Sequence, residues 1–246
     1  MKKTLITLAL ATAFVSTGLS QGFVSWGNAN NTRITTNSVL GGASTGNISA
    51  NAGTVGTTYY FALFYSASAT TVGGSSGSSS PVLGNAGIYA FSDASWTFLN
   101  PAGPYAGYTF GAAYATNTGT AGRYQPENFD PNQSATLVPF TSAAQFVEIG
   151  WSANIGTTWQ QLQAYLANPA ASGLGQGWVG ESDVSGALTP GNPNASPPGL
   201  PTTIFGSTAG LINPFVLGLV PVPEPATLAL AGLGGLSLLL FRRQRK

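Results

Sequence analysis

Two stretches in the middle of the chain decide its fold: TTYYFALFYS at residues 57–66 and AQFVEIGWSA at residues 144–153. Both are rich in aromatic and β-branched residues, which pack well on a pleated surface. Large and small side chains alternate along them, and Gly, Ser, Asn and Thr stand at their borders. This pattern predicts a β-strand for each stretch.

Shorter runs of the same kind lie on both sides of these two. They predict further strands at 22–27, 33–39, 87–92, 95–99, 107–115, 136–140, 202–206 and 214–219. Many short strands separated by turn residues favour a sandwich or barrel over alternating strands and helices. We therefore predict a mainly β fold, a single β-sandwich-like domain.

One segment departs from the strand pattern. Residues 157–166 (TTWQQLQAYL) place Trp159, Leu162, Tyr165 and Leu166 at helical spacing behind a Thr that can cap a helix start. This segment predicts one short amphipathic helix.

Two loops bear on the number of domains. The Gly/Ser run at 72–81 would, as a linker, leave about 50 residues before it, too few to fold alone without disulfides. We therefore expect a long loop within one domain, and the Pro-rich run at 189–201 is expected to lead into the last strands. The predicted exported domain spans residues 21–221.

The composition excludes several classes of chemistry. The 246 residues include 15 charged ones and neither Cys nor His, and Lys occurs only at 2, 3 and 246. Disulfides, Ser-His-Asp or Cys nucleophiles and ordinary zinc sites are therefore excluded from the body. Residues 21–223 hold two cations and six acids, a net charge of −4 that repels phosphate backbones. We expect no nucleic acid partner, no metal and no cofactor.

The first 20 residues have the layout of a secretory leader. Two Lys precede an apolar stretch, and small residues follow, with Gly18 and Ser20 at positions suited to cleavage. The apolar stretch is too short to span a bilayer. We predict a signal peptide at 1–20, read by the Sec translocation machinery and cut between Ser20 and Gln21.

The last 25 residues form a second three-part element. A motif at 222–225 precedes an uncharged apolar run at 226–241, and a basic end follows at 242–246. The run is roughly 24 Å long as a helix, close to a hydrocarbon core of about 30 Å. Because cations stay on the cytoplasmic side, the basic end predicts a transmembrane helix with the body outside. The motif is Val222, Pro223, Glu224 and Pro225, and the topology signal is Arg242, Arg243, Arg245 and Lys246.

These three parts in this order resemble the PEP-CTERM sorting signal of exported proteins in Gram-negative bacteria that make an exopolysaccharide or biofilm matrix. The resemblance implies recognition by exosortase, a membrane transpeptidase that cuts near the motif. It also implies a transient stay in the inner membrane and then the cell envelope, the cell surface or the outside. The runs QGFV at 21–24, QGWVGES at 176–182 and PPGL at 197–200 resemble small verrucomicrobial PEP-CTERM proteins of unassigned activity.

Carboxylates are the main groups left for chemistry in the body. Glu127 with Asp130, and Glu181 with Asp183, could form the pair that a glycosidase needs, although no sugar-hydrolase motif frames either. Loop carboxylates that cap turns are the simpler interpretation. Asp130 with Asn128 and Asn132 could bind calcium, but their spacing is not that of an EF-hand. The G-x-G-x-x-G match at 175–180 neither follows a clear strand nor opens a helix, so we attribute it to chance.

Aromatic residues are the other candidates for binding. Flat rings beside amides and carboxylates suit the faces of sugars. Trp151 and Tyr60 lie inside strands and are expected in the core, whereas Trp178 and Tyr105 lie beside Gly and Pro and are candidate glycan contacts.

The sequence thus favours a non-enzymatic envelope or matrix protein that associates with extracellular polysaccharide. Two alternatives stay open: a carboxylate glycosidase acting on matrix polysaccharide, and a Thr-rich binder of ice or another surface.

Overall fold

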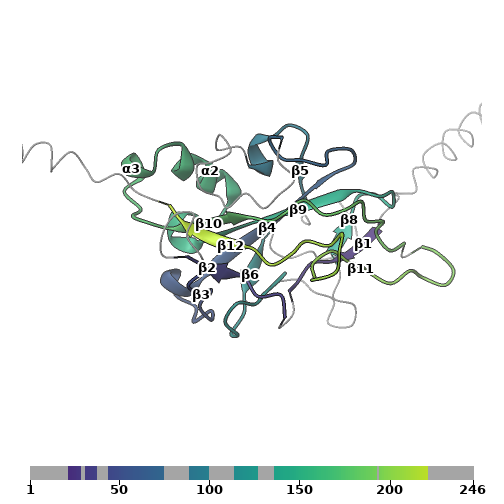
Figure 1. Ribbon diagram of the computed structural model, residues 1–246, viewed down its shortest axis with the longest axis horizontal. Helices are drawn as coiled ribbons and strands as arrows, with labels where there is room; N and C mark the ends of the chain where they lie inside the picture. Colours follow the sequence, from purple (N-terminus) through teal and green to yellow (C-terminus); the bar gives the residue numbers. More distant parts are fainter. Residues whose placement is uncertain are drawn as a thin grey trace, which may run out of the picture.

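The computed structural model describes residues 22–28, 31–37, 44–74, 89–99, 114–126, 136–192 and 194–220. Within these ranges the protein is mainly β, which confirms the predicted fold class. Figure 1 shows an elongated body with two short helices at one end. The strands are β1 (Gly22–Ser25), β2 (Thr35–Thr36), β3 (Gly46–Asn47), β4 (Tyr59–Ser66), β5 (Thr97–Phe98), β6 (Ala115–Asn117), β7 (Tyr124–Pro126), β8 (Thr136–Val138), β9 (Gln145–Ser152), β10 (Trp178–Glu181), β11 (Thr202–Thr203) and β12 (Val216–Leu219).

The centre of the large sheet is the antiparallel pair of β4 and β9. These are the two stretches with the strongest strand signal, and they pair over eight positions, from Tyr59 opposite Ser152 to Ser66 opposite Gln145. The sheet has the order β3-β2-β12-β10-β9-β4-β6-β7, and β5 also pairs with β4. The longest strands therefore occupy the middle, where both faces can be covered.

Both faces of this central pair are buried. On one face Phe61, Leu63 and Phe146 join a core with Val24 and Trp26 of the N-terminal segment. On the other face Phe64, Ile149 and Trp151 join a second core. Alternate side chains of a strand point to opposite faces, so two cores can be built from one pair of strands.

A second, smaller sheet covers the first of these cores. It has the order β11-β1-β8, with β1 parallel to β11 and antiparallel to β8. Instead of two similar sheets facing each other, one large curled sheet dominates, with a three-stranded sheet on one face and a helix on the other.

The helix on the second face is α2 (Trp159–Ala167), and the short α3 (Pro169–Ser172) follows it. The Thr158 hydroxyl accepts a hydrogen bond from the amide of Gln161, as the capping pattern predicts. Leu162 and Tyr165 are buried in the second core. The predicted helix is thereby confirmed, and it begins at Trp159, directly after the capping Thr158.

Two glycines allow the large sheet to close around its first core. Gly150 of β9 pairs with Gly180 of β10. A Cβ atom at Gly150 would lie 2.6 Å from the Phe61 ring, and one at Gly180 would lie 2.6 Å from Leu217. Gly180, the last glycine of the G-x-G-x-x-G match, is therefore required by packing, which the sequence did not indicate.

Some expected elements differ. The expected strand at 87–92 is wrong where it is described, because Ala90–Ser92 forms a 3-10 turn, η2, in which the Ser92 amide donates to the Tyr89 carbonyl. The strands β3, β7 and β10 were not predicted, and the strand expected at 107–115 includes only the first residue of β6. The signal peptide at 1–20 and the tail at 222–246 lie outside the described residues, as does most of the strand expected at 107–115. In the ranges that are described, no helix has the length and apolarity to cross a bilayer.

Candidate functional site

The structure places one of the two aromatic residues expected to contact glycans. Trp178 is half-buried at the start of β10 and packs against the first core, 6.5 Å from Tyr59 between ring centroids. Its indole N–H donates to the carbonyl of Asn37 at 3.1 Å. Trp178 thus has a packing role with part of its ring exposed, while Tyr105 lies outside the described residues. Trp151 is fully buried as expected, and Tyr60 lies half-buried against it.

A buried carboxyl group that the sequence did not single out lies in the first core. Glu148 of β9 is 0% exposed. Its Oε2 contacts the Tyr124 hydroxyl, and its Oε1 has no hydrogen-bond partner among the described residues. Burial raises the pKa of Glu148 well above its usual value, and the hydrogen bond with Tyr124 opposes this only in part.

The hydrogen bonds around Tyr124 indicate where the proton lies. The Tyr124 hydroxyl is 2.6 Å from the carbonyl oxygen of Trp26, which can only accept. A phenol has one proton, so it cannot donate to that carbonyl and to Glu148 at once. A protonated Glu148 resolves this, because it donates to Tyr124, which in turn donates to Trp26. Glu148 is then a neutral acid, and its hydrogen bond links β9 to Tyr124 and, through it, to Trp26 in the first core.

Two other described acids hold the backbone in place. Glu181 of β10 is 2% exposed, and its Oε2 accepts from the Ala90 amide at 2.7 Å. Paired residues share a face, and Glu181 is paired with Ile149, so its side chain lies on the opposite face of the sheet from Glu148. Asp93 accepts from the amides of Gly73 and Ser95, and these bonds lower its pKa.

Of the remaining acidic candidates, Asp183 is half-buried two residues after β10, and the others are not placed. Glu127, Asp130, Asn128 and Asn132 lie outside the described residues. Within the described ranges, no cluster of three or more His, Cys, Asp or Glu could hold a metal ion.

A pocket of about 560 Å³ lies between α2, α3 and the 3-10 turn η3 (Ala153–Ile155). The helix pattern at 157–166 predicted α2 but gave no sign of a pocket beside it. Its walls contain no charged residue, and they combine Ile155, Tyr165 and Leu174 with amide and hydroxyl side chains. The lining residues are Ala153, Asn154, Ile155, Gly156, Thr157, Gln161, Ala164, Tyr165, Asn168, Ala171, Ser172 and Leu174.

Three amides of this pocket are held at one end by the backbone. Asn154 donates to the Gln176 carbonyl at 2.6 Å, Gln161 accepts from the Thr157 amide at 2.7 Å, and Asn168 accepts from the Ala171 amide at 3.1 Å. The other polar group of each side chain has no hydrogen-bond partner among the described residues. Polar groups fixed in this way suit a neutral, hydroxyl-rich ligand, because little conformational freedom is lost when they bind.

The strand that ends the described chain lies beside this pocket. Leu219 of β12 is paired with Trp178, and the Val220 amide donates to the Gly177 carbonyl at 2.8 Å. Val220 is buried, 6% exposed, and the Pro-Glu-Pro motif starts three residues later in the sequence. Only two residues of sequence therefore separate the last described residue from the Pro-Glu-Pro motif.

A comparison with protein families finds a match in this last part of the chain. The PEP-CTERM protein-sorting motif matches residues 221–246. This chain carries a PEP-CTERM motif. No curated protein and no solved structure matches the chain.

The PEP-CTERM motif implies a protein that is exported and sorted by exosortase, a membrane enzyme, to the cell surface. This confirms the resemblance drawn from residues 222–246. The match covers only the end of the chain, so it assigns no activity to the body, and the likeness to verrucomicrobial proteins stays a prediction.

Proposed function

We propose that this protein is a non-enzymatic component of the cell envelope or extracellular matrix that associates with polysaccharide. In this proposal Sec exports it with its leader, residues 226–241 hold it in the inner membrane, and exosortase then releases the body. The PEP-CTERM motif is the observation that carries the proposal, because it implies sorting to the cell surface and processing by exosortase.

The described part of the body supports a binding role. Glu148 and Glu181 are buried, and Asp93 holds two backbone amides, so none of these three acids is placed to act on a substrate. The uncharged pocket beside α2 offers fixed amides and apolar surface, which matches the chemistry of neutral glycans.

The sorting step is tested by replacing Pro223, Glu224 and Pro225 with Ala in a host that carries exosortase. We expect unchanged export but accumulation of a full-length, membrane-held protein, since the leader and the apolar run are untouched. Ser237→Ala, within the apolar run, is the matched control and should be processed normally. Equal release of the triple variant and the unaltered protein would contradict the proposal.

The binding step is tested with a variant that fills the pocket. Ala164 is exposed and lines the pocket, whereas the adjacent Gln163 is exposed and does not. Ala164→Trp should reduce binding of the purified body to polysaccharide from the host matrix and to neutral glucans on an array, and Gln163→Trp should not. Equal binding by the two variants, or release of reducing sugar by the unaltered body, would contradict the proposal.

A further inference from the structure

The short connection between the body and the tail limits how the uncleaved protein can sit on a membrane. Five residues, 221–225, separate the buried Val220 from the first residue of the apolar run. Val220 and Ala226 are therefore six residues apart, and their Cα atoms are separated by at most about 22 Å when the chain is fully extended. A compact domain of some 200 residues is more than 30 Å across, since its radius of gyration is about 16 Å. The end of the body at β12 must therefore lie close to the bilayer.

That end of the body is built from neighbouring segments. Val220 is bonded to Gly177, and Gln176 accepts a hydrogen bond from Asn154 of η3. Leu174 is three residues from Gly177, so their Cα atoms are at most about 11 Å apart. Figure 1 shows β12 and β10 at the same end of the molecule as α2 and α3. We call η3, α2, α3 and residues 173–177 the C-terminal end of the body.

The C-terminal end of the body carries no charge, and the same holds for the longer runs 34–92 and 184–223, so the short tether is what selects this end. No residue from 149 to 180 is charged, a run of 32 residues that contains the whole C-terminal end. Leu174 is 49% exposed there. A charge close to a bilayer loses hydration, and a body of net charge −4 is repelled by anionic lipids. An uncharged end with an exposed leucine avoids both costs.

We propose that, in the uncleaved protein, the C-terminal end of the body lies against the outer surface of the membrane that holds the tail. The occupant of this surface is the lipid headgroup region. The inference rests on the proposed insertion of residues 226–241. It adds an orientation for the body, and it places the pocket beside α2 on the bilayer side until the tail is cut.

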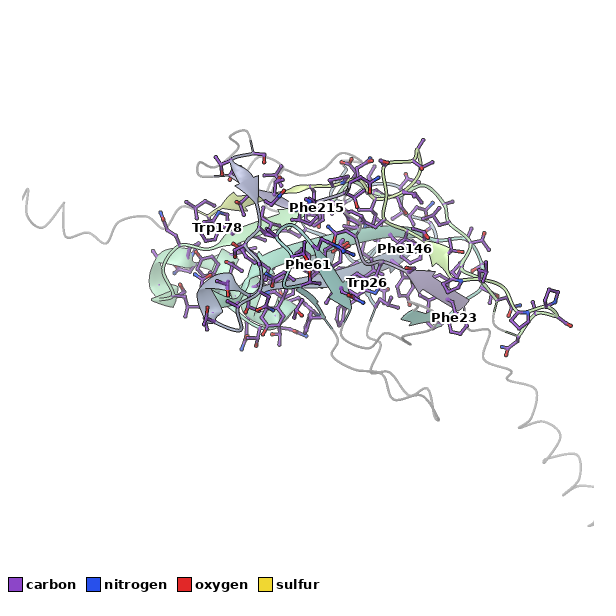
Figure 2. The ribbon with its side chains drawn as sticks, turned by 90° about the horizontal axis from the view of Figure 1, so that it is seen from below. Phe23, Trp26, Phe61, Phe146, Trp178 and Phe215 are labelled. Carbon is purple, nitrogen blue, oxygen red and sulfur yellow. The ribbon has the colours of Figure 1, made fainter. Side chains whose placement is uncertain are left out.

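The absence of Cys from the chain allows a direct test. Leu174→Cys and Leu200→Cys each introduce one thiol, which is labelled with an environment-sensitive fluorophore in the full-length protein. Leu200 is 85% exposed, and it lies at the other end of the body, because its carbonyl is beside Gly191, which bridges to Phe23. Figure 2 shows Phe23 and Trp178 at opposite ends.

The labelled proteins are reconstituted in vesicles of phosphatidylethanolamine and phosphatidylglycerol that contain headgroup spin-labelled lipid. We expect loss of fluorescence at position 174 and no loss at position 200 beyond that of the tail-less body. Inserting a 20-residue Gly/Ser linker after Val220 should restore the emission at position 174, because the tether then reaches much further.

Two failures can be told apart by vesicle flotation. If the protein does not float with the vesicles, the tail does not insert and the proposed sorting route fails with it. If it floats and the two positions are quenched equally, the tail inserts but the proposed orientation is wrong.

Discussion

Replacing Glu148 with Gln should change how the stability of the body depends on pH. Glu148 is 0% exposed and its pKa is raised by burial, so the folded protein keeps a proton that the unfolded chain loses near the ordinary value of 4.5. Above that pH the folded state binds more protons, and its stability falls as pH rises. The loss is about 1.4 kcal/mol for each pH unit until the raised pKa is reached.

Glu148→Gln removes this titration and keeps the shape of the side chain. Its amide can still donate to the Tyr124 hydroxyl, as the protonated acid does. The free energy of unfolding of the variant, relative to the unaltered body, should therefore increase by about 1.4 kcal/mol per pH unit above pH 5. Urea denaturation of residues 21–221 at half-unit steps of pH, followed by tryptophan fluorescence, measures this difference.

Asp93→Asn is the matched control, because its effect on the pH dependence of stability should have the opposite sign. Backbone hydrogen bonds from Gly73 and Ser95 lower the pKa of Asp93 below 3.8, so its contribution is present above that value and is lost as pH falls. The free energy of unfolding of Asp93→Asn should differ from that of the unaltered body in neutral solution, and the two values should converge in acid. Parallel pH profiles for Glu148→Gln and the unaltered body would refute the assignment of the proton to Glu148.

Three further experiments test the packing, the helix start and the topology. Gly150→Ala should lower the free energy of unfolding by about 1–3 kcal/mol, because the new Cβ would lie 2.6 Å from the Phe61 ring; a thermal shift measures it, and an unchanged midpoint would contradict the packing. Thr158→Ala should cost about 1 kcal/mol in urea unfolding, since the amide of Gln161 loses its cap, whereas Thr158→Ser should cost much less. Replacing the four cations at 242–246 with Ser should weaken membrane retention of the precursor, and unchanged fractionation would refute the topology.

The central strands were predictable because their signal is local. The stretches 57–66 and 144–153 carry enough β-branched and aromatic residues to specify strands without knowledge of their partners. The start of α2 was predictable for the same reason, since the Thr158 hydroxyl accepts a hydrogen bond from an amide only three residues away. Residues 90–92 look similar in composition but form a 3-10 turn, in which Ala90 donates to Glu181 from a distant part of the chain.

Strand β10 could not be predicted for a related reason. In the run 178–181 (WVGE), two residues that favour strands are followed by glycine and glutamate, which strands disfavour, so the composition gives no clear signal. Gly180 belongs there because Leu217 of β12 and Phe61 of β4 fill the space over the glycine pair. That space exists only after three strands from distant parts of the sequence have come together.

Glu148 is a site residue that the sequence indicates only in part. A glutamate within AQFVEIGWSA, between apolar neighbours, is a visible exception to the strand's composition. The partners that make it a neutral core acid, Tyr124 and the Trp26 carbonyl, are 24 and 122 residues away. The exception could have been flagged, but its role required the fold. The pocket beside α2 likewise depends on η3 and α3 meeting that helix, and only the sorting motif was complete in the sequence itself.

The two ends of the body constrain the order of maturation. Cleavage after Ser20 would leave one residue before β1, and β1 is closely packed at its first residue, because a Cβ atom at Gly22 would lie 2.4 Å from the ring of Pro190. Phe23 and Trp178 lie at opposite ends of the body (Figure 2), and Trp178 marks the end from which the tail leaves. A folded body that kept both leader and tail in the membrane would be held at both ends and would have to lie along the bilayer. In the proposed sorting route, the orientation on the C-terminal end of the body is therefore reached only after the leader has been removed.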